Sequence, residues 1–144
     1  SATVNEAYLI KEIMIDMEKC VESKKFINTG TIDKWRSLWG IKETKYIKDK
    51  YIFPRIKNKD LKKINPNRLI QADSAKIIIA GMASTIEAFL DIDGEYLAGK
   101  STSIIIDKKE NLKYLISILN SKLISFFINI YYQAIISKHF LYHS

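Results

Sequence analysis

The stretch KIIIAGMASTIEAFLDIDGEYLAGKSTSIIID, residues 76–107, decides the fold. Its opening apolar run at 77–80 is rich in β-branched residues, which predicts a fully buried strand. Residues 86–90 predict a second strand, and residues 104–106 predict a third. Asp93-Gly94 predicts a hairpin turn, because glycine adopts positive φ at no steric cost. The polar, glycine-containing loops between these strands should lie at the edge of a sheet, where binding sites are common.

Length and composition predict one globular domain. The chain has 144 residues, of which 47% are hydrophobic and 27% charged. No uncharged apolar segment reaches the roughly 18 residues of a membrane span, and the start lacks the pattern of a signal peptide. Cys20 is the single cysteine, which excludes a disulfide framework and a cysteine zinc site. We therefore expect a cytoplasmic protein that does not contact a membrane.

The positive charge is concentrated in one segment. The formal net charge is +7, and residues 34–76 contain 13 Lys or Arg against 4 Asp or Glu. Such a concentration is typical of a protein that binds a polyanion. The alternative is a lysine-rich surface that is merely solvated, and the charge alone leaves both interpretations open.

The N-terminal half predicts a helix followed by strand-like segments. Apolar residues at three- and four-residue spacing predict a helix at 5–22, capped by Asn5. A strand at 24–28 and a turn at Thr29-Gly30 follow. Trp35 and Trp39 in residues 31–40 are four apart and would share one face if this segment is a short helix, with core packing the commoner reason for such a pair.

The remaining segments complete an α+β pattern. Residues 44–56 predict strand structure that ends near Pro54, and residues 57–68 predict a polar loop. Residues 110–137 predict one long helix with a wide apolar face, capped by Asp107 or Asn111. We expect a single α+β domain with a twisted mixed or antiparallel β-sheet and flanking helices. Residues 1–24 would be a helix leading into a domain formed by 25–144.

Signals for catalysis are weak. His139 and His143 are four residues apart, but no Glu follows the first as in metalloproteases. The chain contains no GxGxxG motif and no P-loop. Asn65-Pro66-Asn67-Arg68 begins like the Asn-Pro-Pro-Tyr motif of adenine methyltransferases, but lacks the aromatic residue that stacks on a flipped base. We interpret this tetrapeptide as a turn.

An acidic cluster comes closest to a metal site. Asp91, Asp93 and Glu95 suggest a metal-dependent nuclease, but Leu97 stands where such an enzyme has a lysine two residues after the glutamate. We interpret the cluster as a solvated hairpin. The sequence therefore predicts no catalytic residue and no metal ligand in this chain.

Four stretches together resemble a known family. They are FINTGTID at 26–33, continuing through Leu38-Trp39-Gly40 to Lys45-Tyr46, then KIIIAGM at 76–82 with Glu87-Ala88 and Asp91, GKST at 99–102, and LISILNSKLISFF at 115–127. This order resembles the TaqI-like C-terminal specificity domain, the DNA target recognition domain of adenine-N6 DNA methyltransferases and of fused type IIG restriction–modification enzymes. The resemblance covers about residues 25–132. Because methyltransferase and nuclease motifs are missing, it implies a domain excised from a larger enzyme.

The resemblance implies that site recognition and catalysis lie in different domains of one enzyme. This part would select a site on double-stranded DNA without catalytic activity of its own. The methyltransferase domain of the parent chain would use S-adenosylmethionine to methylate an adenine, and Mg²⁺ would be needed where the parent also cleaves DNA. We expect no cofactor in this chain, and two partners: double-stranded DNA and that methyltransferase domain.

Physical chemistry indicates which residues would contact DNA. Lysine and arginine neutralise phosphates, whereas polar side chains on exposed loops reach base edges. Gly30, Gly81 and Asn120 are predicted to be structural, in a turn, in tight packing and in helix-end or interhelix hydrogen bonding respectively. The predicted DNA-contacting residues are Thr29, Thr31, Asp33, Arg36, Lys42, Glu43, Lys45, Ser84, Thr85, Lys100, Ser101 and Thr102.

Two other functions remain open. The apolar helix at 110–137 could dock a protein partner, with the basic segment incidental. Alternatively, Tyr46, Tyr51 and Phe53 among lysines could stack on the bases of RNA. The concentration of positive charge favours DNA recognition over protein docking.

Overall fold

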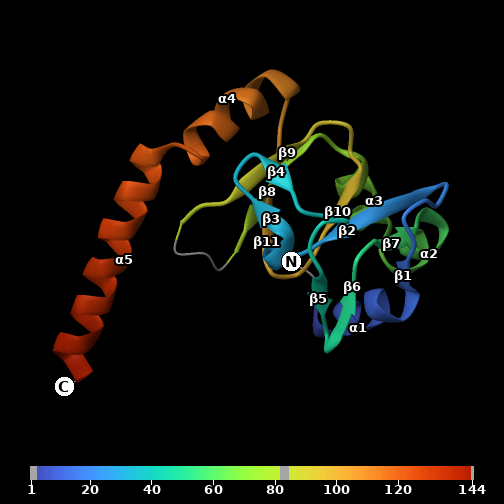
Figure 1. Ribbon diagram of the computed structural model, residues 1–144, viewed down its shortest axis with the longest axis horizontal. Helices are drawn as coiled ribbons and strands as arrows, with labels where there is room; N and C mark the ends of the chain where they lie inside the picture. The colour runs from blue at the N-terminus through green and yellow to red at the C-terminus, as the bar shows by residue number, and fades with distance from the viewer. Residues whose placement is uncertain (1–2, 82–84, 144) are drawn as a thin grey trace.

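The computed structural model of the chain describes residues 3–81 and 85–143, with side chains described as far as Lys138. A long helix projects from a body of short strands and helices (Figure 1). The first half of the chain forms α1 (Val4–Ile13), β1 (Ile15–Asp16), β2 (Ser23–Ile27), the 3-10 helix η1 (Thr29–Thr31), β3 (Ile32–Asp33), β4 (Arg36–Ser37), β5 (Thr44–Tyr46), β6 (Asp49–Tyr51), β7 (Pro54–Lys57), α2 (Asn58–Ile64) and α3 (Pro66–Asp73). The second half forms β8 (Lys76–Ala80), β9 (Ala88–Asp91), β10 (Tyr96–Ala98), β11 (Thr102–Ile106), α4 (Lys109–Leu119) and α5 (Lys122–His143).

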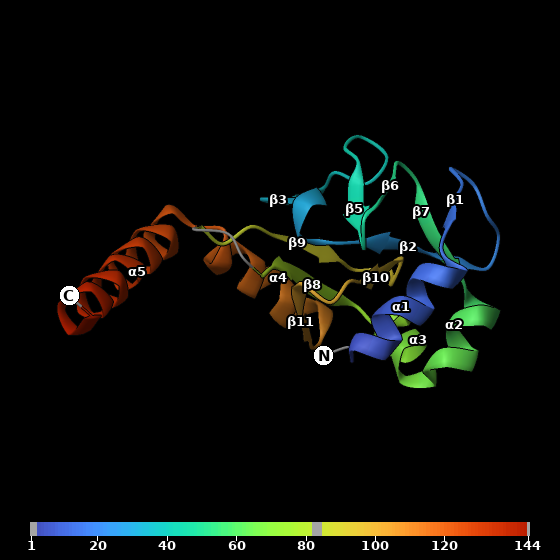
Figure 2. The same cartoon turned by 90° about the horizontal axis from the view of Figure 1, so that it is seen from below.

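Two sheets form the centre of the body. The first has the strand order β1-β7-β2-β10, with β2 and β10 parallel, and the second is the antiparallel sheet β11-β8-β9. Figure 2 shows α1, α2 and α3 gathered on one side of the first sheet. The pairs β3–β4 and β5–β6 are separate two-stranded hairpins.

Side-chain alternation explains how the layers pack. Neighbouring residues of a strand point to opposite faces, so Phe26 enters the core shared with α1 and α2 while Ile27 packs against the second sheet. Likewise Ile78 faces the first sheet, whereas Ile77 packs with Leu112 of α4. The layers are therefore helices, first sheet, second sheet and α4, which confirms the predicted single α+β domain with mixed and antiparallel sheets and flanking helices.

The first helix is shorter than predicted. It ends at Ile13, and the following residues form β1, which pairs with β7. The Asp16 carboxylate accepts hydrogen bonds from the backbone N–H groups of Ile52 and Phe53, at 3.2 and 2.6 Å, and these tertiary contacts outweigh local helix propensity. The N-cap is Thr3, whose hydroxyl accepts from the Glu6 N–H, and not Asn5.

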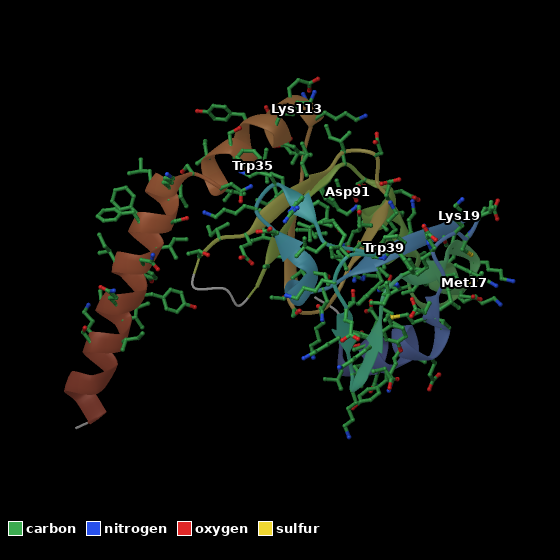
Figure 3. All side chains as sticks on the ribbon, viewed as in Figure 1. Met17, Lys19, Trp35, Trp39, Asp91 and Lys113 are labelled. Atoms are coloured by element: carbon green, nitrogen blue, oxygen red, sulfur yellow. The ribbon has the colours of Figure 1, made fainter. Side chains whose placement is uncertain are left out.

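Residues 31–40 do not form the short helix that would place Trp35 and Trp39 on one face. Residues 32–37 form the β3–β4 hairpin, with Trp35 at φ 71° near its tip. Trp35 is exposed, whereas Trp39 is half-buried, donates from Nε1 to the Pro54 carbonyl at 2.9 Å and packs edge-on against Phe53. Figure 3 shows the two tryptophans well apart. Pro54 begins β7 and does not end a strand, a position that proline tolerates because it needs no ladder N–H there.

The predicted polar loop at 57–68 is also wrong, because these residues form α2 and the start of α3. Leu61 is fully buried against the first sheet, while the lysines on either side of it remain at the surface. Asn65 caps α3 by accepting from the Asn67 N–H at 3.1 Å, and Pro66 occupies the first helical turn. Asn-Pro is thus a helix start, not the turn that the sequence suggested.

The strands at 76–80, 88–91 and 102–106 confirm the three predicted around the opening stretch. Asp93-Gly94 does form a turn, with Gly94 at φ 65°, but it does not close a hairpin. The strand before it belongs to the second sheet and the strand after it pairs with β2 of the first. This turn therefore carries the chain from one sheet to the other.

The C-terminal helix is broken. Helix α4 ends at Leu119. The C-cap residue Asn120 accepts from the Ala88 N–H at 3.2 Å and donates to the Ala88 carbonyl at 2.8 Å through its side chain. This bond to β9 confirms the predicted structural role of Asn120 at a helix end. Helix α5 continues at an angle of 59°. Among the described residues no single helix is long and apolar enough to cross a bilayer, and α4 with α5 reach that length only as this bent pair.

The buried Tyr46 should make the folding stability of the chain decrease at alkaline pH. Its ring is buried against Phe26, its hydroxyl donates to the Ala7 carbonyl at 3.0 Å, and burial raises its pKa to about 12. The unfolded chain ionises tyrosine near pH 10, so folding stability should fall as pH rises from about 10 to about 12, by up to roughly 3 kcal/mol. We expect Tyr46→Phe to cost about 1 kcal/mol at pH 7 and to weaken this alkaline loss, measured by urea unfolding between pH 7 and 11.

The exposed Tyr114 provides the control for this prediction. Tyr114→Phe should match the parent chain at every pH. Equal alkaline losses in the parent chain and in Tyr46→Phe would contradict the prediction.

Candidate nucleic-acid interface

Three segments meet at one edge of the first sheet. Because β2 and β10 are parallel, the residues that follow them, 28–31 and 99–102, emerge side by side. Residues 42–45, which lead into β5, lie against the first of these segments. We call residues 28–31, 42–45 and 99–102 the loop cluster.

Asn28 holds the loop cluster together. Its Oδ1 accepts a hydrogen bond from the Ser101 hydroxyl, and its Nδ2 donates to the Lys45 carbonyl at 3.4 Å. The Thr29 hydroxyl lies 2.7 Å from the Ser101 carbonyl, to which it donates. Sequence reasoning missed Asn28. The sequence feature that could have identified Asn28 is its position as an asparagine directly between a buried strand and a Thr-Gly turn.

Two glycines permit the close approach of these segments. A Cβ at Gly99 would lie 2.7 Å from Asn28 Oδ1, so a side chain there would push Asn28 out of place. A Cβ at Gly81 would overlap the Ser101 carbonyl oxygen, which accepts from the Gly81 N–H at 3.1 Å. The prediction that Gly81 permits a tight contact is therefore confirmed. Close backbone contacts, as well as side-chain hydrogen bonds, therefore fix the positions of these loops.

The exposed charges of the loop cluster are mainly positive. Lys42, Lys45 and Lys100 are exposed, and within the described part of the chain none of them forms an ion pair. Glu43 is exposed as well, but Lys50 pairs with it at 3.3 Å. A cleft of about 190 Å³ lies between residues 28–31 and 42–45. Three lysines around locked loops would attract an anionic ligand.

The threonines of the loop cluster differ in exposure. Thr31 is fully buried and lines the cleft, and its hydroxyl donates to the Asn28 carbonyl. The half-buried Thr102 donates to the Gly99 carbonyl at 2.7 Å, which closes the turn before β11. Thr44, which sequence reasoning missed, is fully buried and lines the cleft. Its hydroxyl has no hydrogen-bond partner among the described residues and can bond to a ligand or to water.

Asp33 and Arg36 lie on the β3–β4 hairpin, which packs against β9 and not within the loop cluster. They pair with each other at 3.3 Å. The ammonium of Lys34, between them, lies 3.2 Å from the Ser125 hydroxyl of α5 and ties the hairpin to that helix. Thr85 is half-buried in the segment between β8 and β9, and the predicted Ser84 lies outside the described residues.

Part of the basic segment serves the fold. Arg55 donates to the carbonyls of Met17 and Glu18, at 3.0 and 2.8 Å. Arg68 pairs with Glu6 at 3.1 Å and donates to a backbone carbonyl of β10, and burial lowers its pKa. Lys76 is fully buried. The excess charge at 34–76 therefore overstates the number of cations that a ligand can reach.

Lys76 forms a buried ion pair with Asp91. The Lys76 ammonium bonds to one Asp91 oxygen and to the Ala72 carbonyl at 2.8 Å. The Asp91 carboxylate also accepts from the backbone N–H groups of Glu95 and Tyr96, at 2.9 and 3.0 Å. Burial lowers the pKa of Lys76, and Asp91 opposes this shift. The predicted solvated acidic hairpin is therefore wrong for Asp91, which is 3% exposed.

Two alternative chemistries lack the required arrangement. Tyr46 is buried and Phe53 packs edge-on against Trp39, so of the three aromatic residues considered for stacking on RNA bases, Tyr46 has no free face, Phe53 is partly covered and Tyr51 is half-buried. Within the described ranges, no three His, Cys, Asp or Glu side chains are placed to hold a metal ion. The side chains of His139 and His143 lie outside the described part.

The chain matches one family. The model of the TaqI-like C-terminal specificity domain matches residues 40–142, most of the chain. The match includes two segments of the loop cluster, 42–45 and 99–102, and begins after the third. No curated protein matches this sequence.

Proposed function

The chain belongs to the family of TaqI-like C-terminal specificity domains, whose role is DNA recognition in restriction–modification enzymes, and we propose that it reads a specific sequence of double-stranded DNA through its loop cluster. A specificity domain is non-catalytic by itself. The observation that carries the proposal is the set of three exposed lysines on loops locked by Asn28. Loops fixed before binding lose little entropy when a ligand binds, which favours a defined register on DNA.

The contacts divide between phosphates and bases. Lys42, Lys45 and Lys100 are proposed to neutralise phosphates, because their ammonium groups are exposed. The Thr29 and Ser101 hydroxyls already bridge the loops and hold that surface in shape. Within the loop cluster, base reading is then assigned to Glu43, whose carboxylate can accept from a cytosine amino group. Outside the loop cluster, it is assigned to Arg36 of the β3–β4 hairpin, whose guanidinium suits guanine.

The proposal extends to the parent enzyme. We propose a cytoplasmic adenine-specific DNA methyltransferase of a type II restriction–modification system that uses S-adenosylmethionine, with Mg²⁺ involved where it also cleaves DNA. Its methyltransferase domain would be the second partner of this chain. The support is the family, whose specificity domains choose a site for chemistry performed elsewhere.

Binding to a randomised duplex library tests the proposal. Three phosphate contacts predict that the logarithm of the binding constant falls with the logarithm of salt concentration with a slope of about −3. Fluorescence anisotropy at several salt concentrations measures this slope, and sequencing of the bound duplexes identifies a motif. We expect both a steep slope and an enriched short sequence.

Other outcomes would overturn defined parts of the proposal. Salt-sensitive binding without enrichment would contradict base reading by this chain. Absence of binding at low salt would contradict DNA recognition as a whole and favour a protein-docking function.

A further inference from the structure

Trp35 occupies a turn position that does not suit tryptophan. The last residue pair of the β3–β4 hairpin joins Asp33 to Arg36, so Lys34 and Trp35 form a two-residue loop. Trp35 holds the second position of this loop at φ 71°, a conformation that glycine or asparagine adopts at little cost and a bulky residue does not. The geometry of the turn therefore does not explain why a tryptophan stands there.

Packing within the chain does not explain Trp35 either. The residue is 57% exposed. Among the described residues it belongs to none of the three core clusters and forms no aromatic pair and no cation–π contact. A residue that combines a strained backbone with an exposed aromatic ring is typical of a binding site, where a contact outside the chain offsets the strain.

The tip of the hairpin is held in place from two sides. The Trp35 N–H donates to the Ala88 carbonyl of β9 at 2.9 Å. The Lys34 ammonium donates to the Ser125 hydroxyl of α5 at 3.2 Å. Because these bonds fix the backbone that carries the indole ring, the ring would lose little freedom when a ligand binds to it.

The hairpin stands beside the loop cluster. Thr31 of the loop cluster is four residues before Trp35, and an extended chain spans at most about 3.6 Å per residue, so the two lie within about 14 Å of each other. Figure 2 shows β3 on the same side of the body as β5 and β6, opposite α1, α2 and α3. One turn of a DNA duplex is about 34 Å long, so a duplex on the loop cluster would also reach Trp35.

The surroundings of Trp35 favour a base over a phosphate as the group that it meets. A hollow of about 340 Å³ beside Trp35 also borders Asp93 and Glu95, whose carboxylates repel phosphates. The faces of bases are uncharged and stack on aromatic rings. On these grounds we infer that Trp35 is a wedge that stacks on a base of bound DNA and partly separates that base from its neighbour. The inference rests on the proposed function and adds a further contact to it.

The variant Trp35→Asn separates binding from folding. Asparagine tolerates positive φ, so this variant should unfold at the same or a higher urea concentration than the parent chain. Its affinity for random-sequence duplex DNA, measured by anisotropy at low salt, should be about 5- to 100-fold weaker, as is usual when a stacking aromatic ring is removed. The salt slope should not change, because indole is uncharged. Tyr114→Ala, which removes an exposed ring from α4, is the control and should bind as the parent chain does.

Tryptophan fluorescence reports the stacking itself. An indole ring that stacks on a base loses much of its emission, so saturating DNA should quench the fluorescence of the parent chain. Trp35→Asn retains the half-buried Trp39 and should be quenched little by the same DNA. Trp35→Phe, which keeps a smaller ring for stacking, should lose less affinity than Trp35→Asn.

The possible failures can be told apart. Equal DNA affinities of the parent chain and Trp35→Asn would overturn this inference alone and would point to a protein partner at the hollow beside Trp35. Equal quenching of the two chains, or a clear loss of stability in Trp35→Asn, would also overturn it. Absence of DNA binding by the parent chain would overturn the proposed function together with the inference.

Discussion

Asp91→Ala is expected to lower the free energy of unfolding by about 3–5 kcal/mol, because it leaves the buried Lys76 ammonium without its counter-charge. The same change removes the acceptor for two backbone N–H groups in the turn that joins the two sheets. Urea unfolding at pH 7 measures the loss. This loss in the free energy of unfolding should exceed the loss from truncating an ordinary apolar core side chain, because the Lys76 charge remains in a site that excludes water.

A double-mutant cycle separates the ion pair from the packing of its atoms. Lys76→Met alone should also destabilise, but Lys76→Met with Asp91→Ala should recover much of the stability, since no unpaired charge remains. The pH dependence provides a second check. Without Asp91 the largest opposition to the burial that lowers the pKa of Lys76 is lost, so the Asp91→Ala chain should become more stable as pH rises. A loss below about 1 kcal/mol would contradict a structural role for this pair.

The buried pair illustrates what sequence patterns can and cannot predict. The runs at 77–80 and 104–106 are continuous and β-branched, and such residues are buried in almost any arrangement of strands, so these strands were predictable. Asp91 stands among other acidic residues, and only its register opposite Lys76 takes it into the core. Lys76 and Asp91 are 15 residues apart in the sequence, so their pairing depends on the tertiary structure and cannot be predicted from a local sequence pattern.

The errors in the helices have the same origin. Residues 15–22 have helical periodicity, but Asp16 gains more from capping the backbone of Ile52 and Phe53 than from a helical turn. The break at Asn120 depends on the backbone N–H and carbonyl of Ala88 in β9, an edge strand of the second sheet. The missed helix α2 differs, because its Asn-Pro boundary was a local signal that lysine-rich composition obscured.

The candidate site was predictable as a set of loops but not in detail. Charge and glycine positions indicated residues 29–31, 42–45 and 99–102, and the structure brings these segments together. The exposure of individual side chains was not predictable from the sequence. Thr29 and Thr31 flank the same glycine, but only Thr31 is fully buried. The bonds of Asn28 also join segments that are 17 and 73 residues away. Locking of the loops is therefore visible only in three dimensions.

Reversing two charges of the loop cluster should nearly abolish DNA binding. Lys42→Glu with Lys45→Glu replaces two attractions by two repulsions, each worth about 1 kcal/mol at about 4 Å in water. The sum is about 4 kcal/mol before screening by salt, so we expect binding at least about a hundredfold weaker in anisotropy titrations at 0.1 M salt. Losing two phosphate contacts should also reduce the magnitude of the salt slope by about 2. Both side chains are exposed, so folding stability should not change.

Lys62→Glu with Lys63→Glu is the matched control. It makes the same change in net charge within the same basic segment, but on exposed positions of α2, at the right-hand edge of the body in Figure 1. If the net charge alone attracts DNA, the two double variants should weaken binding equally. If DNA sits on the loop cluster, the α2 variant should lose only a few-fold and keep its salt slope, because contacts beyond one Debye length of about 10 Å are screened. Equal losses would therefore refute the placement of DNA on the loop cluster while leaving its attraction to DNA intact.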